Sequence, residues 1–209
     1  MTLPNFVSPN DPCPFLRALV ADGYIGDHLE PLSALTRTIA TAARESPTRP
    51  QVSSIKVYLI ALIANGLSPA RLARSLREGV RLDELRSGPL DKRGVGSRIL
   101  DVAGRIDERE LERLDEFAVD KVDTSGAAER GLGAEQLRIM MDANFARSRG
   151  HRRKIDRVLM EGEWPVLLRV TGKASSDGPY LSLTDLRTLF VDRRLPPRVT
   201  ERLEAPQRA

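Results

Sequence analysis

Apolar positions at helical spacing recur along most of the chain and predict a protein built from helices. In residues 28–44, Leu32, Leu35 and Ile39 follow the i, i+3, i+7 spacing that puts side chains on one helix face. Residues 52–64 are apolar nearly all round, which predicts the central buried helix. Further helices are expected over residues 13–21, 69–78, 108–120, 134–149, 152–160 and 183–192.

Helix-start signals support this reading. Ser68 precedes Pro69, Asp107 precedes another helical stretch, and Ser182 stands three residues before Asp185, as in a capping box.

The stretches between the helices complete the expected fold. Four glycines make residues 88–104 a long loop, only residues 166–170 suggest a strand, and the Pro196–Pro197 pair is expected to end regular structure. The fold class is therefore predicted to be all-α: one irregular domain of about eight helices over residues 1–209. Its ends are an extended segment (1–12) and a flexible tail (197–209).

The amino-acid composition indicates a folded protein and bears on which partner molecules are expected. Hydrophobic residues make up 41% and charged residues 30%, which excludes a disordered chain. The net charge of +4 comes with 33 basic residues, of which only five are lysine. This imbalance is typical of a GC-rich bacterial genome. With no helix-turn-helix, zinc or RNP signature, no nucleic-acid partner is expected.

The compartment is predicted to be the cytoplasm. A single cysteine cannot form an internal disulfide. Residues 1–14 lack the basic and apolar stretches of a signal peptide. The longest apolar run, residues 57–64, is far shorter than the ~20 residues of a membrane span, so no membrane partner is expected.

The single cysteine, Cys13, is the most informative residue. Pro14 disfavours a helical conformation at Cys13 and is itself suited to the first helical position. Cys13 is therefore expected at an N-cap, where the amides of Phe15 and Leu16 and the helix dipole favour a thiolate. Such a sulfur could be a metal ligand or a nucleophile; the alternative is a small buried apolar residue.

The segment around Cys13 carries a family resemblance. Residues 12–25 read PCPFLRALVADGYI, which resembles the opening motif of the haem-thiolate chloroperoxidases and unspecific peroxygenases. Arg17 and Asp22 depart from that motif without touching the ligand. Residues 180–196 read YLSLTDLRTLFVDRRLP and are similar to the family's closing helix.

The resemblance implies a nearly all-helical fold and a cofactor. It implies that Cys13 binds the iron of haem b as the proximal ligand, within a cofactor-binding set of Pro12, Cys13, Pro14 and Leu16. The family uses hydrogen peroxide to oxidise, halogenate or oxygenate small organic molecules. Peroxide and a small-molecule substrate are therefore the expected partners.

Residues 160–168 read MEGEWPVLL and are the candidate for the distal side of the haem, the face opposite Cys13. The resemblance makes Glu163 the acid–base residue, with a pKa raised by an apolar pocket beside Trp164. Its helper would be Arg157 or His151. The alternative is that these are solvated side chains at a helix end and in an exposed basic turn.

The family's cation motif has no counterpart here. Its nearest alignment is residues 93–101, RGVGSRILD, which lack the Glu and Ser ligands. The Mg or Mn ion is therefore expected to be absent. Arg93 or Arg98 could instead pair with a haem propionate, or both could be solvated.

Three functions remain open from the sequence. The first is a haem-thiolate peroxidase or peroxygenase, and the second is a haem-binding sensor or carrier without that chemistry. The third is a haem-free helical interaction module that docks an acidic partner through residues 147–157.

Overall fold

A computed structural model describes residues 6–44, 52–86, 88–91 and 98–205. Within these ranges the chain forms nine α-helices and five strands. Helix accounts for 54% of the described residues and strand for 12%, so the prediction of an all-α fold is wrong. The strands form two antiparallel sheets, one of two strands and one of three.

The N-terminal half is a group of short helices tied by the two-stranded sheet. In this sheet β1 pairs with β2, although three helices lie between the two strands in the sequence. Gly79 allows the chain to pass close to β1, because a Cβ at this position would lie 2.3 Å from the Glu30 carbonyl oxygen. Its backbone also has a φ of 115°, which favours glycine. The elements are α1 (Pro14–Ala21), β1 (Leu29–Glu30), α2 (Leu32–Ala42), α3 (Ser54–Ile63), α4 (Pro69–Glu78), β2 (Val80–Arg81) and the 3₁₀ turn η1 (Leu82–Glu84).

The three-stranded sheet replaces part of an expected helix. Residues 108–120 divide into α5 (Glu108–Glu112), the 3₁₀ turn η2 (Arg113–Glu116) and β3 (Val119–Val122). β3 forms a hairpin with β4 (Ala128–Gly133), which pairs in turn with β5 (Tyr180–Ser182). The hairpin turn is held by Asp123, whose Oδ1 accepts hydrogen bonds from the amides of Ser125 and Ala127. A partner strand thus overrides the local helical pattern.

The two longest helices pack against each other. α6 (Ala134–Arg147) packs against α7 (Lys154–Thr171), and α7 continues through Pro165. The strand expected over 166–170 is therefore wrong. Buried side chains on both sides of the proline, Trp164 and Leu167, hold this helix together by packing.

The C-terminal segment remains regular beyond the proline pair. α8 (Leu183–Arg187) and a π turn η3 (Thr188–Asp192) lead to α9 (Pro197–Glu204), which packs on α2. The prediction that Pro196–Pro197 ends regular structure is wrong, because Pro197 occupies the first position of α9. Most of the expected flexible tail is this helix; residues 206–209 lie outside the described ranges.

The helix-start predictions are confirmed. Ser68 accepts a hydrogen bond from the Arg71 amide, Asp107 from the Arg109 amide, and Ser182 from the Asp185 amide. α3, however, is not buried all round: Ile55 is 73% exposed and Leu59 53% exposed.

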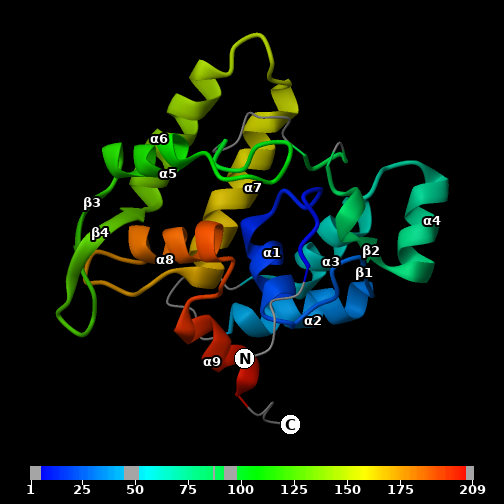
Figure 1. Ribbon diagram of the computed structural model, residues 1–209, viewed down its shortest axis with the longest axis horizontal. Helices are drawn as coiled ribbons and strands as arrows, with labels where there is room; N and C mark the ends of the chain where they lie inside the picture. Colours follow the sequence, from blue (N-terminus) through cyan, green and yellow to red (C-terminus); the bar gives the residue numbers. More distant parts are fainter. Residues whose placement is uncertain (1–5, 45–51, 87, 92–97, 206–209) are drawn as a thin grey trace.

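The elements lie in two groups around a centre. In Figure 1, α1 and α7 lie between α2–α4 on one side and α6 with the three-stranded sheet on the other. Among the described residues, no helix combines the length and the apolar character needed to cross a bilayer.

Candidate functional site

Cys13 occupies the expected position at the start of α1. It is the N-cap residue, with extended φ of −92° and ψ of 112°, and Pro14 follows as the first helical residue. Cys13, Pro12 and Leu16 are half-buried and Pro14 is buried. The sulfur therefore lies at the boundary between the helix N-terminus and the core, against which Cys13 packs.

A buried polar network fixes the loop that carries Cys13. The Cys13 amide donates to Asp11 Oδ1 at 2.9 Å. The guanidinium of Arg17, which is 2% exposed, donates to the carbonyl oxygens of Ser8 at 3.1 Å, Asp11 at 3.3 Å and Gly104 at 3.2 Å. Arg17, one of the two departures from the family motif, thus fastens the Cys13 loop to a segment 87 residues away.

The protein around Cys13 favours the neutral thiol. Burial, together with the negative charges of Asp11 and Glu163, raises the pKa of Cys13 to about 12. The amides of Leu16 and Phe15 face the sulfur and lower its pKa, but neither closes a side-chain capping hydrogen bond. The two amides favour the thiolate as predicted, but the expectation of a thiolate at Cys13 is wrong, because desolvation outweighs the two amide dipoles.

The structure brings Glu163 close to Cys13. Glu163 lies half-buried on α7, and its carboxylate is near enough to act electrostatically on the sulfur. The adjacent Trp164 is 2% exposed and its ring centroid lies 6.3 Å from that of Phe190 on η3, a turn that packs on α1. The pairing of these two segments, 150 positions apart, was expected from the resemblance alone.

The two candidate helpers of Glu163 do not join it. Arg157 forms ion pairs with Asp142 at 2.8 Å and Glu161 at 3.1 Å, which hold it between α6 and the exposed side of α7. His151 is exposed in the turn before α7. α7 begins at Lys154, three residues after His151, and Lys154 lies about 13 Å from Glu163 along the axis at a rise of about 1.5 Å per residue.

Sequence reasoning missed a buried ion pair on the face of α7 that carries Glu163. Asp156, seven residues before Glu163, is fully buried and accepts hydrogen bonds from the Arg153 side chain at 2.7 and 2.9 Å. A spacing of seven residues places Asp156 almost in line with Glu163. The Arg-x-x-Asp spacing at the helix start was the available signal.

Asp11 was also missed as a candidate site residue. It is 1% exposed, and its Oδ2 has no hydrogen-bond partner. Burial raises its pKa to about 7, against the lowering effects of the Cys13 amide and of the charges on Arg17 and Arg86. A carboxyl group next to the sulfur therefore changes charge near neutral pH.

The arginines proposed for propionate binding are only partly described. Arg93 lies outside the described residues. Arg98 has a left-handed backbone with φ of 59° and donates to Ser148 Oγ at 3.4 Å. The structure therefore places Arg98 near the end of α6.

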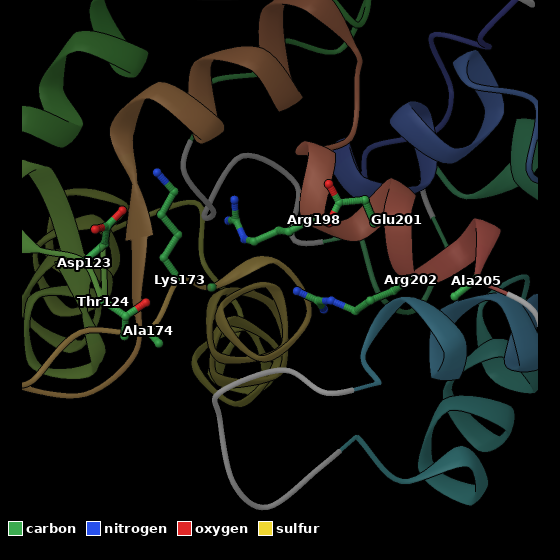
Figure 2. Close-up of a pocket in the computed structure, with 9 residues that line it drawn as sticks. Asp123, Thr124, Lys173, Ala174, Arg198, Glu201, Arg202 and Ala205 are labelled. Carbon is green, nitrogen blue, oxygen red and sulfur yellow. The ribbon is translucent and has the colours of Figure 1, made fainter. Parts of the chain in front are cut away.

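A hollow of about 540 Å³ lies elsewhere, between the C-terminal end of α7 and α9. Lys173, Arg198 and Arg202 extend toward it (Figure 2). Each is already bound: Lys173 to Glu129 at 2.6 Å, Arg198 to Asp185 at 2.7 Å, and Arg202 to two backbone carbonyls. We interpret this cluster as structural, since each of its three cations binds a carboxylate or a carbonyl oxygen of another element.

Comparison of the chain with protein-family models, with curated proteins and with solved structures finds no match. Within the described part of the chain, no group of three or more His, Cys, Asp or Glu side chains is arranged to hold a metal ion.

Proposed function

We propose that the protein is a haem-thiolate peroxidase or peroxygenase of the cytoplasm. In this proposal Cys13 is the proximal ligand of haem b, and hydrogen peroxide and a small organic molecule are the substrates. The observation that carries it is that the charge of Glu163, on α7, acts on the sulfur at the start of α1.

The chemistry of the donor set fits the cofactor. A neutral thiol is a poor nucleophile, whereas a bound iron cation would replace its proton and offset the negative charges of Asp11 and Glu163 that act on it. The facing amides of Phe15 and Leu16 would then stabilise the ligated sulfur, as donors near a thiolate do. Pro12, Pro14 and Leu16, which flank Cys13 in the chain, would supply apolar groups to the cofactor-binding set.

The cofactor, when bound, supplies the redox chemistry, and the thiolate increases electron density at its iron. The chain's part is to hold the ligand and to move protons. The Asp11–Arg17 network keeps Cys13 at the helix terminus. Glu163 would take a proton from peroxide and return it during O–O cleavage. Arg93 and Arg98 remain the proposed partners of the propionates.

A second candidate is a haem-binding protein without turnover. It is favoured by the positions of Arg157 and His151, neither of which assists Glu163. The two candidates share the Cys13 ligand and differ in whether bound haem uses peroxide productively.

The deciding experiment is an absorption spectrum after haem addition, in the ferric state and as the ferrous–CO complex. We expect the red-shifted CO band of a thiolate-ligated haem in the wild type and its loss in Cys13→Ala. Ser68→Ala is the matched control, because it removes the N-cap side chain of α4 without removing a sulfur.

Two results would contradict the proposal. A CO band that survives in Cys13→Ala would show that another residue binds the iron. Absence of haem binding in the folded wild type would exclude both haem candidates and leave the haem-free interaction module.

A further inference from the structure

The hairpin of α3 and α4 exposes an unusual amount of aliphatic surface. Ile55 is 73% exposed, Leu67 63%, Leu76 58%, Leu59 53% and Ile60 47%. These five side chains, here named the α3–α4 face, fall within 22 consecutive residues. Several exposed aliphatic side chains within one short segment are a candidate for an interaction surface.

α4 is an amphipathic helix that leaves one of its two leucines, Leu76, exposed. Leu72 and Leu76 lie one turn apart, and Arg74 lies across the helix from Leu76. Arg74 reaches inward to Glu84 of η1, with N–O distances of 3.1 and 3.3 Å. The ion pair with the body of the protein leaves Leu76 facing solvent, while Leu72 is half-buried.

The charges around the α3–α4 face are mostly positive. Residues 52–78 contain four basic residues and one acidic residue, a net charge of +3 out of +4 for the whole chain. Lys56 is exposed and, among the described residues, forms no ion pair; the Arg77 side chain is 77% exposed and pairs with its neighbour Glu78 at 2.6 Å.

We infer that the α3–α4 face binds the surface of an anionic lipid bilayer, a peripheral contact that departs from the sequence-based expectation of no membrane partner. Aliphatic side chains on an exposed helix, bordered by Lys and Arg, are the features of interfacial membrane binding. A second copy of the chain fits less well, because a two-fold contact would bring like charges together. A docked helix needs a concave groove, and the hollow beside α3, between it and α2, is lined by none of the five aliphatic residues.

The test is cosedimentation with phosphatidylcholine vesicles, with and without phosphatidylglycerol. We expect binding that requires phosphatidylglycerol and weakens as salt is added. The double variant Leu59→Ser/Leu76→Ser should bind about tenfold less. Ile139→Ser/Val158→Ser is the matched control and should bind as the wild type, because it removes two aliphatic side chains of similar exposure (45% and 61%) on α6 and α7.

Lys56→Gln/Arg77→Gln tests the charge separately and should remove most of the salt dependence while keeping the aliphatic surface. The inference is overturned by equal binding to both vesicle types, by binding that survives both double variants, or by absence of binding. A dimer detected by light scattering that Leu59→Ser/Leu76→Ser dissociates would assign the face to a second copy instead.

Discussion

Desolvation decides the protonation of Cys13. Amides at a helix N-terminus stabilise a negative charge by about 0.3–1 kcal/mol, with about 2 kcal/mol in favourable partly buried geometries. Removing a charged group from water costs several kcal/mol. With Asp11 and Glu163 adding negative potential, the thiol keeps its proton until a cation replaces it.

Asp11 should make stability depend on pH. Its pKa is raised by burial from 3.8 to about 7, so the folded protein holds a proton that the unfolded chain has lost. Stability from this group is therefore present below pH 3.8 and declines as the pH rises to about 7. Urea unfolding of Asp11→Asn between pH 4 and 8 should lack this decline.

The control for that measurement is Asp27→Asn, which alters an exposed carboxylate of the same type and should follow the wild type. An Asp11→Asn variant with an unchanged pH profile would mean that Asp11 does not titrate in this range. Arg17 and Arg86, the cations whose charges act on Asp11, are retained in all three proteins.

Glu163→Gln should separate haem binding from catalysis. Haem spectra should be unchanged, while peroxide-dependent oxidation of a small phenol should fall about 100-fold or more because the amide cannot take a proton. Glu161→Gln is the matched control, since Glu161 is an exposed partner of Arg157 on the same helix. Equal activity of wild type and Glu163→Gln would favour the haem protein without turnover.

Arginine side chains from α9 stabilise the ends of other helices. The last carbonyls of a helix have no partner within it. Arg202 donates to the Ala42 carbonyl at 2.6 Å and the Val170 carbonyl at 2.9 Å, at the C-termini of α2 and α7. Arg198 likewise donates to the Thr171 carbonyl. α9 thus connects helices that are far apart in sequence.

Arg202→Ala should lower the free energy of unfolding by about 2 kcal/mol, because it removes two charge-assisted hydrogen bonds. Arg187→Ala is the control; its ion pair with Glu108 is more than half exposed and should contribute about 0–1 kcal/mol. Equal losses in urea unfolding would indicate that Arg202 acts as a surface charge only.

The three-stranded sheet joins the middle of the chain to its C-terminal part. Gly131 on β4 faces the ring of Tyr180 on β5, and Tyr180 is fully buried with its hydroxyl donating to Glu129 at 2.7 Å. Lys173 and Ser182 also donate to Glu129; although burial raises the pKa of this carboxyl, these hydrogen bonds bring it below its usual range.

Gly131→Ala should therefore destabilise the whole fold by about 1–3 kcal/mol. The added Cβ would lie 2.4 Å from Tyr180 Cδ2, and the ring is held in place by Glu129. Gly162→Ala in α7 is the matched control. Its Cβ would meet nothing within 4 Å, and alanine should stabilise the helix by up to ~1 kcal/mol. Thermal unfolding of both variants measures the two opposite shifts.

Local signals gave the parts of the fold that depend on neighbouring residues. The N-caps Ser68, Asp107 and Ser182 were predictable because each side chain bonds amides two or three positions away. The N-cap position of Cys13 followed in the same way from Pro14. The strands could not be found like this, since β3 and β4 are stabilised by pairing across the sheet and not by local propensity.

The sequence by itself determined where most helices begin, where the cysteine stands, and that the chain folds. The tertiary structure alone decided which helix faces are covered, and so exposed the aliphatic side of α3. It also decided the charge of Cys13 and the separation of Arg157 and His151 from Glu163. The physical reason is that capping acts over one helical turn, whereas burial and electrostatic potential depend on groups from the whole chain.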